Sequence, residues 1–218
     1  MTLINLIKQL EEKSKKRKFK QTYELIINLK KEYDLNKTEN RILDYFELPH
    51  GKGKKNLICA IVGNELEKIA RDIFDYVIVK DKLPEISSNK RLAKKIAKKY
   101  YIFVSQMSVM PDVGKYLGRY LGSRDKMPNP RFGMVFPDNF SEVQLRNLYN
   151  KMQKMVRVSI KKHLTFGVPV GNEDMEIEKI NENITAFLDW LYKRLPGGKS
   201  MIRSIYLKLT MSKAVKLL

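Results

Sequence analysis

One stretch of the sequence, from Gly51 to residue 106, constrains the fold more than any other. Three apolar runs, NLICAIVG, YVIVK and YIFVSQ, each have the length of a buried strand, and the amphipathic segments ELEKIARDI and NKRLAKKIAKKY separate them. Asn89 stands where it caps the second of these helices. Strands that alternate with helices predict a parallel sheet covered on both faces, so this part of the chain is predicted to be a Rossmann-like α/β domain.

The segments on either side of this region are predicted to form one further domain. Their apolar spacing predicts helices near residues 2–15 and 21–33 and over MEIEKINENITAFLDWLYKRL, and strands over RILDYFEL, 154–160, 166–170 and SMIRSIYLKLTM. The simplest architecture is an α/β protein of two domains. Residues 1–52 and 157–218 build a split α+β domain, and residues 53–156 form the inserted Rossmann-like domain.

Two connections between these domains are expected to act as a hinge. The first is the loop PHGKGKK, in which Pro49, Gly51 and Gly53 permit wide backbone angles. The second is the segment near Val156. Paired connections of this kind allow one domain to rotate against the other.

The net charge of the chain points to a polyanion as its partner. The 218 residues include 43 Lys and Arg against 24 Asp and Glu, a formal net charge of +19. Such a bias favours nucleic acid first and an anionic membrane second, and solvated lysines on helix faces are the alternative explanation. The cations gather at both ends, seven from Lys8 to Lys20 and seven from Lys193 onward. If both ends belong to one domain, they give it a basic face.

Phe19 is the apolar residue least expected in its surroundings. It stands among Arg17, Lys18 and Lys20, where a core residue would not be expected. A partner outside the chain is one explanation, and cover for a helix end is the other.

The sequence lacks the residue patterns of an enzyme. His50 and His163 lie in different segments without a Ser, Cys or carboxylate motif beside either. After the first predicted strand the chain reads GNELE (63–67), which is no phosphate-binding loop, and acidic residues at a helix start repel phosphate. Cys59 lies in an apolar run and is predicted to be a buried, unreactive thiol. No cofactor, metal, signal peptide or membrane span is expected, and a reducing cytoplasm suits the single cysteine.

A second basic segment, MPDVGKYLGRYLGSRDKMPNPRFG, gathers glycines and cations. Gly114, Gly118 and Gly122 alternate there with Lys115 and Arg119. The segment either cradles a phosphate group or forms a short helix that its glycines allow to pack closely. The residues alone leave both interpretations open.

Several motifs resemble the large-ribosomal-subunit protein L-one family in its archaeal form. They follow the family's order and read RKFKQTYELIINLK (17–30), LPHGKGK (48–54), VMPDVGK with LGRYLGSRDKMPNP (109–130), VGNEDM (170–175) and RSIYLKLTM (203–211). The resemblance implies an RNA-binding protein without enzymatic activity that is monomeric within the cytoplasmic ribosome. Its split domain would hold large-subunit rRNA in the mobile lateral stalk. Contact with exit-site tRNA, and repression of translation through the leader of its own mRNA, are further implications.

Position by position, the resemblance assigns RNA contacts to the first and the last motif. The residues are Lys18, Phe19, Thr22, Glu24, Ser204, Thr210 and Met211, with the adjoining Ser212 and Lys213. A-form RNA presents 2′-hydroxyls and base edges in a shallow minor groove, which hydroxyl groups, a flat apolar surface and an acceptor recognise better than cations alone. Glu24 is informative, because a carboxylate among phosphates is tolerable only when it accepts a hydrogen bond. Roles in a helix cap for Thr22, at a helix dipole for Glu24 and in the core for Met211 are alternatives.

The chain departs from the family pattern at three places. Ser212 and Lys213 follow Thr-Met where the family has glycine, and Ser123 and Asp125 replace a proline and a glycine. Gly167 stands where a basic or aromatic residue is common. Two other functions stay open on the sequence: a nucleotide-using enzyme built on the α/β insert, and a free RNA-binding repressor that never joins a ribosome.

Overall fold

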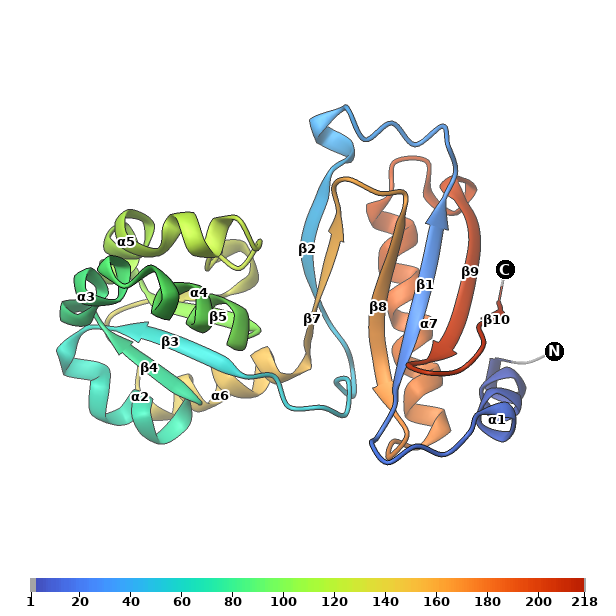
Figure 1. The fold of residues 1–218 in the computed structure, drawn as a ribbon, viewed down its shortest axis with the longest axis horizontal. Helices are drawn as coiled ribbons and strands as arrows, with labels where there is room; N and C mark the ends of the chain where they lie inside the picture. The colour runs from blue at the N-terminus through green and yellow to red at the C-terminus, as the bar shows by residue number, and fades with distance from the viewer. Residues whose placement is uncertain (1–2, 218) are drawn as a thin grey trace. The chain divides into compact units, whose positions relative to one another are not determined.

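The computed structural model describes residues 3–217, and their contacts divide the chain into two compact units (Figure 1). The terminal unit comprises the chain up to Lys54 and again from Lys154 onward, and the inserted unit is Lys55–Gln153. Parallel and antiparallel sheets occur together with helices, so the predicted α/β fold class is confirmed.

The inserted unit is a parallel sheet with helices on both faces. Its strands, in the order β4-β3-β5-β6, are β4 (Tyr76–Val79), β3 (Ile58–Val62), β5 (Ile102–Gln106) and β6 (Val135–Phe136). Its helices are α2 (Glu67–Ile73), α3 (Leu83–Ser88), α4 (Lys90–Lys99), α5 (Met110–Gly122) and α6 (Glu142–Lys154). In Figure 1, α3, α4 and α5 lie on one side of the sheet, and α2 and α6 lie on the other. Every residue of β3 and β5 is buried, which explains their continuous apolar sequence.

Two local predictions in this unit are confirmed. Asn89 caps α4, because its side chain accepts a hydrogen bond from the backbone N of Leu92 at 3.1 Å. Cys59 is fully buried in the core that α3, α4 and α5 form with the sheet, and this burial raises the pKa of its thiol well above the usual value. The thiol is therefore protonated and shielded at neutral pH.

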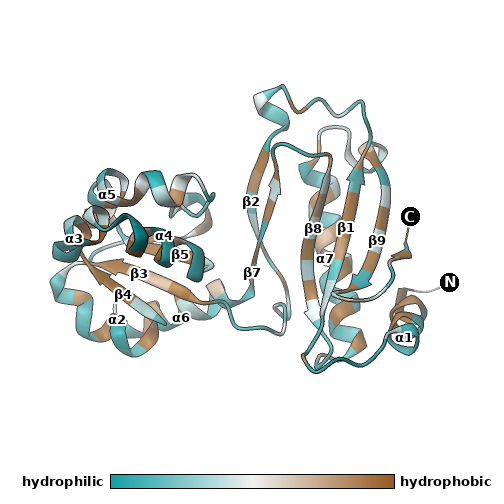
Figure 2. Cartoon of the chain, viewed as in Figure 1, coloured by the Kyte–Doolittle hydropathy of each residue, from teal (hydrophilic) through white to brown (hydrophobic). Residues whose placement is uncertain are grey.

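The terminal unit is built on an antiparallel sheet with the order β10-β9-β1-β8. The strands are β10 (Val215–Lys216), β9 (Ile202–Leu209), β1 (Thr22–Leu29) and β8 (Thr165–Asn172), and a separate two-stranded ladder pairs β2 (Ile42–Glu47) with β7 (Met155–Ile160). Helices α1 (Leu3–Lys13) and α7 (Ile177–Arg194) supply apolar side chains to the same core as the sheet. Figure 1 shows α7 behind the sheet, and Figure 2 shows how apolar residues alternate with polar ones along the strands.

The helix predicted over residues 21–33 is wrong, because this segment contains strand β1. Its residues alternate between half-buried and buried, and Tyr23, Leu25, Ile27 and Leu29 all point into the core. Strand β1 pairs with β8 on one side and with β9 on the other. A period of two in burial, together with adjacent β-branched isoleucines, favours a strand over a helix.

Candidate nucleic-acid interface

The alternation along β1 gives the sheet a polar outer face, turned away from the core. Cross-strand register places Glu24 opposite Lys208, Ile26 opposite Tyr206 and Asn28 opposite Ser204 on β9. On the other side the same β1 residues face Pro169, Gly167 and Thr165 of β8. We call this surface, formed by the outward residues of β1, β8 and β9, the outer face. It brings together predicted contact residues that lie about 180 positions apart in the sequence.

Thr22 and Thr210 meet at one end of the outer face. The backbone N of Thr22 donates a hydrogen bond to Oγ1 of Thr210 at 3.1 Å. The backbone N of Met211 donates to Oε1 of Gln21 at 3.0 Å, and Gln21 is fully buried. The first and the last motif are thereby fixed to each other, so the helix-cap role considered for Thr22 does not apply.

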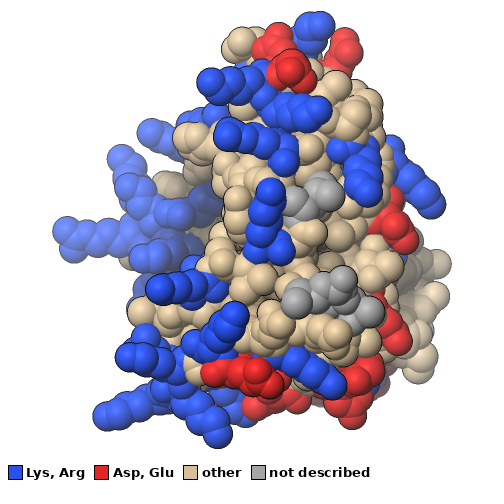
Figure 3. Space-filling view, turned by 90° about the vertical axis from the view of Figure 1, so that its right-hand side faces the viewer, with Lys and Arg blue, Asp and Glu red and all other residues tan. Residues whose placement is uncertain are grey.

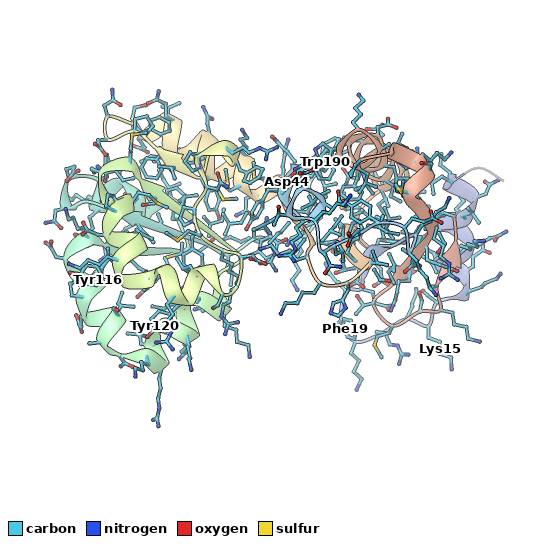
Figure 4. All side chains as sticks on the ribbon, turned by 90° about the horizontal axis from the view of Figure 1, so that it is seen from above. Lys15, Phe19, Asp44, Tyr116, Tyr120 and Trp190 are labelled. Carbon is cyan, nitrogen blue, oxygen red and sulfur yellow. The ribbon has the colours of Figure 1, made fainter. Side chains whose placement is uncertain are left out.

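Two large apolar side chains flank this junction and are exposed. Phe19 is 51% exposed and Met211 is 58% exposed. Figure 4 shows Phe19 and Trp190, which belongs to α7, on opposite sides of the terminal unit. Neither Phe19 nor Met211 fills the core, so the core role considered for Met211 is wrong. Both side chains are therefore accessible to a partner that would remove their apolar surface from water.

Glu24 lies on β1, the central strand of the outer face, two residues from Thr22 and not at a helix start. Within residues 3–217 its carboxylate forms no hydrogen bond or ion pair, although Lys208 is its cross-strand neighbour. The helix-dipole role considered for Glu24 is therefore wrong. The carboxylate is available to accept hydrogen bonds from a ligand on the sheet.

Ser204 lies at the opposite end of the outer face from Thr210. Its Oγ accepts a hydrogen bond from Nδ2 of Asn28 at 2.9 Å, and Oγ1 of Thr165 donates to Oδ1 of Asn28 at 2.7 Å. Five residues of β9 (205–209) lie between Ser204 and Thr210, and the six steps along the chain span roughly 20 Å. Asn28 and Thr165 were missed from the sequence, since a helical interpretation of 21–33 does not place Asn28 on this surface.

Basic side chains border the outer face at both ends. A groove near Ser204 is lined by Lys31, Arg203, Tyr206 and Lys216 among others. Near Phe19, a hollow is lined by residues 16–20 and by acidic side chains from α1 and Glu173. Figure 3 views the molecule from the side of the chain ends and shows Lys and Arg side chains spread over this near face, with fewer Asp and Glu among them.

The departures from the family pattern are absorbed locally. Oγ of Ser212 accepts a hydrogen bond from the backbone N of Leu209 at 2.9 Å, which closes the turn after β9 beside the exposed Lys213. Asp125, which replaces a glycine, adopts a φ of 56°. Aspartate tolerates this left-handed conformation better than most residues, so the backbone bends there without glycine.

Buried amide side chains hold the first predicted hinge loop against the terminal unit. Nδ2 of Asn183 donates to the carbonyl oxygens of Gly51 at 2.7 Å and Val170 at 2.9 Å, and its Oδ1 accepts from the backbone N of His50 at 3.0 Å. Asn172 donates to the carbonyl oxygen of Gly53 at 2.8 Å. Asn172 and Asn183 were missed from the sequence, because hydrogen bonds between distant segments leave no local pattern.

A matching clamp holds the start and the end of the inserted unit together. Asn56 donates its backbone N to Oε1 of Gln153 at 2.8 Å and its Nδ2 to the carbonyl oxygen of Met152 at 2.9 Å. Nε2 of Gln153 donates in return to the carbonyl oxygen of Asn56 at 2.9 Å. Val156, the other predicted hinge residue, is fully buried in β7 opposite Phe46.

Replacing Asn183 by leucine is expected to destabilise the protein by about 2–4 kcal/mol. The substitution keeps the size of the side chain but leaves two carbonyl oxygens and one N–H buried without partners, and each unsatisfied group is costly. Urea denaturation followed by circular dichroism measures the effect. Asn181→Leu, on the same helix at a half-buried position, serves as the control and should change the unfolding free energy by less than about 1 kcal/mol. Equal effects of the two substitutions would contradict the clamp.

The edge of the parallel sheet where α/β proteins bind nucleotides is filled by the chain's own side chains. Oε1 of Gln106, at the end of β5, accepts a hydrogen bond from the backbone N of Gly63 at 2.7 Å. Nε2 of Gln106 donates to Oε1 of Glu65 at 2.7 Å, and this bond is the main cause that lowers the pKa of Glu65. An ionised carboxylate thus stands where a phosphate would bind. The arrangement speaks against the nucleotide-using enzyme.

Two further findings concern functions considered from the sequence. Nε2 of His50 lies 2.5 Å from Oε2 of Glu182 on α7, a pair that the sequence did not indicate, at an exposed position. No helix within residues 3–217 is both long and apolar enough to cross a membrane.

Comparison with known proteins gives the family. Two α/β units with a polar, hydroxyl-bearing sheet face that cations border define a candidate nucleic-acid-binding protein. The profile of the Ribosomal protein L1p/L10e family matches residues 10–213. Large ribosomal subunit protein uL1 of Nanoarchaeum equitans is 48% identical over 219 residues, which cover 100% of both chains. The proteins of the same name from Thermococcus kodakarensis and Methanocaldococcus jannaschii are 38% and 39% identical, and each alignment covers 98% of this chain and 95% or 94% of the relative.

This chain belongs to the ribosomal protein L1 family, and the resemblance to its archaeal form is confirmed. Members of the family are structural components of the ribosome. The prediction that the chain is not an enzyme agrees with this membership.

Proposed function

We propose that the outer face of the terminal unit binds large-subunit rRNA and thereby forms the mobile lateral stalk near the tRNA exit site of the cytoplasmic ribosome. One observation carries the proposal: the first and the last motif, which the family resemblance assigns to RNA, lie side by side on one polar sheet face. The contact set is Lys18, Phe19, Thr22, Glu24, Ser204, Thr210, Met211, Ser212 and Lys213. Hydroxyl groups, an exposed aromatic ring and a free carboxylate suit the minor groove of folded RNA.

The inserted unit is proposed to move relative to the terminal unit as the stalk contacts exit-site tRNA. Because amide side chains clamp residues 50–53 to the terminal unit, and others clamp Asn56 to Gln153, the freest backbone lies between these clamps. The pivots are then residues 54–55 and the junction between the end of α6 and the start of β7 at residues 154–155, next to where contacts divide the chain. Gly51 and Gly53, with φ values of 66° and 71°, shape the clamped turn.

The same outer face is proposed to bind the leader of the protein's own mRNA and repress its translation. The support is chemical: a face that reads RNA shape through hydroxyl and carboxylate groups accepts any RNA that reproduces this shape. A protein with this activity still joins the ribosome, in contrast to a free repressor. Co-sedimentation with large subunits separates the two possibilities.

A protein without the inserted unit tests where rRNA binds. Residues up to Lys54 are joined to those from Lys154 by a short linker, which is feasible because the backbone N of Leu48 donates to the carbonyl oxygen of Lys154 at 3.1 Å. We expect this variant to bind the stalk region of large-subunit rRNA within about tenfold of the full chain, a difference of about 1.4 kcal/mol. Filter binding provides the measurement.

A substitution on the outer face of this shortened protein provides a control. Glu24→Ala should abolish much of its preference for stalk rRNA over random duplex RNA. If the shortened protein folds, as judged by circular dichroism, yet binds stalk rRNA no better than random duplex RNA, the outer face is not the site.

A further inference from the structure

A second concentration of cations lies in the inserted unit. Helices α4 and α5 pack on the sheet through buried residues such as Ala93, Ile96, Leu117 and Leu121. Their outward sides line a groove that we call the α4/α5 groove, which is formed by Lys90, Lys94, Arg119, Tyr120, Ser123 and Arg124. Four of these six residues are cations and none is acidic. Figure 4 marks Tyr120 on α5.

Three of the four cations in the groove have no charged partner within residues 3–217. Within residues 3–217, the side chains of Lys90, Lys94 and Arg119 form neither an ion pair nor a hydrogen bond. The sequence of α4, KRLAKKIAKK, contains six cations and no acidic residue. Like charges one turn apart repel, and Lys90 and Arg91 stand at the positive end of the helix dipole. Helix stability therefore does not explain the pattern, whereas an anionic ligand does.

Helices on the other side of the same sheet show the balanced arrangement. On α2 the guanidinium of Arg71 pairs with Glu67 at 2.5 Å, and on α6 Arg146 pairs with Glu142 at 2.8 Å. Both pairs join residues one helical turn apart, which is the usual way to neutralise a helix surface. On α2 and α6 an acidic residue thus stands one turn from an arginine, whereas α4 contains no acidic residue to pair with its cations.

Two glycines of α5 adjoin groove residues in the sequence, since Gly118 precedes Arg119 and Gly122 precedes Ser123. A Cβ atom added at Gly118 or Gly122 would have no atom within 4 Å, and neither residue needs a left-handed φ. Glycine inside a helix is disfavoured relative to alanine. The interpretation that glycine lets α5 pack closely is therefore wrong at Gly118. The bare helix surface leaves room for a ligand to approach the backbone.

We propose that the α4/α5 groove binds the phosphate backbone of an RNA strand, as a second RNA contact separate from the outer face. Arginine and lysine bind phosphate through charge-assisted hydrogen bonds, and the hydroxyl group of Tyr120 can donate to phosphate or ribose oxygens. The hydroxyl group of Ser123 donates to the carbonyl oxygen of Tyr120 at 3.3 Å, and its oxygen can accept from a ribose hydroxyl. Contacts of this kind bind RNA of any sequence. The concave shape and the lack of an aliphatic or tryptophan side chain in the lining fit a strand better than a lipid surface, which takes inserted apolar groups. The inference goes beyond the proposed function, since the outer face does not require it.

The test compares two triple variants of the full-length chain with equal changes in charge. The first is Lys90→Gln, Lys94→Gln and Arg119→Gln. The control is Lys68→Gln, Lys82→Gln and Lys151→Gln, three exposed lysines of the same unit outside the groove. Fluorescence anisotropy with a single-stranded RNA of about 20 nucleotides and mixed sequence, between about 50 and 300 mM salt, gives the slope of log affinity against log salt.

We expect the groove variant to reduce the magnitude of this slope by roughly 1.4–2.1, which corresponds to two or three lost phosphate contacts, and the control to reduce it by less than about 0.7. Equal reductions would mean that only general surface charge is involved, and no reduction in the groove variant would mean that RNA does not bind there. Binding to vesicles that contain phosphatidylserine tests whether the groove binds lipid headgroups instead. Loss of vesicle binding with unchanged RNA binding in the groove variant would assign the groove to lipid headgroups and overturn the proposal.

A second pair of variants guards against misfolding. Gly122→Glu adds a carboxylate beside the groove at a position with free space, and it should weaken the binding of mixed-sequence RNA in the same direction. Gly122→Ala, the matched control, should bind as the unchanged protein does. Glu24→Ala on the outer face should leave the salt slope unchanged. The experiments therefore distinguish a groove that does not bind RNA from an outer face that does not bind rRNA.

Discussion

Replacing Glu24 by alanine is expected to weaken binding to stalk rRNA by about 1–3 kcal/mol, although the change makes the protein more basic. The carboxylate lies on the outer face between β8 and β9 and has no partner within residues 3–217. In a complex it would accept a hydrogen bond from a 2′-hydroxyl or a guanine amino group in a site that excludes water, and its loss leaves that donor unsatisfied. Filter binding or calorimetry against stalk rRNA and random RNA measures the effect.

Two control variants separate shape-specific recognition from general attraction. Phe19→Ala should also weaken binding to stalk rRNA with an unchanged salt slope, since stacking on an aromatic ring is worth about 1–3 kcal/mol per base. Lys18→Ala should instead flatten the salt slope on both RNAs, by roughly 0.7–0.9 for one lost phosphate contact. If Glu24→Ala tightens binding to stalk rRNA, the carboxylate has no role in recognition.

The fold of the inserted unit was the more predictable part of the chain. Its strands are buried on both faces and its helices carry clear amphipathic patterns, so local sequence and tertiary environment agree. Helix α6 was nevertheless not predicted, although its buried residues Leu145, Leu148 and Met152 have helical spacing. For β1, the apolar run Leu25–Ile27 is compatible with the period of an α-helix and with that of a β-strand. The strand is defined by its pairing with β8 and β9, which lie far away in the sequence and therefore leave no local pattern.

The candidate site was predictable where it follows short motifs and unpredictable where it depends on tertiary register. Resemblance placed Thr22 and Thr210 in one contact set, and the structure brings them within a hydrogen bond of each other. It gave no indication of Asn28 and Thr165, whose roles arise because β1 pairs with β8 and β9 together. The unbalanced charge of the α4/α5 groove was visible in the sequence as a basic segment, but its open glycines became evident only from the packing.

Substituting valine for Thr210 is expected to give the second large effect, on both stability and binding. Valine has the shape of threonine but lacks Oγ1, so the backbone N of Thr22 loses its acceptor. Where that N–H stays shielded from water, the protein loses about 1–3 kcal/mol of unfolding free energy. The hydroxyl proton is also lost. In the free protein it points to a distant acceptor, the carbonyl oxygen of Thr22 at 3.4 Å, and is therefore available to a ribose hydroxyl.

Thr210→Ser is the matched variant, because it keeps the hydroxyl group and removes only a methyl group. We expect serine to retain binding to stalk rRNA within about 1 kcal/mol and valine to lose about 1–3 kcal/mol more. Binding is measured without urea, after circular dichroism has shown that both variants are folded. A urea titration gives the stability of each variant. If the valine variant is less stable but binds stalk rRNA as tightly as the serine variant, Thr210 only joins the two motifs. If only the valine variant loses binding, the hydroxyl group of Thr210 contacts the RNA.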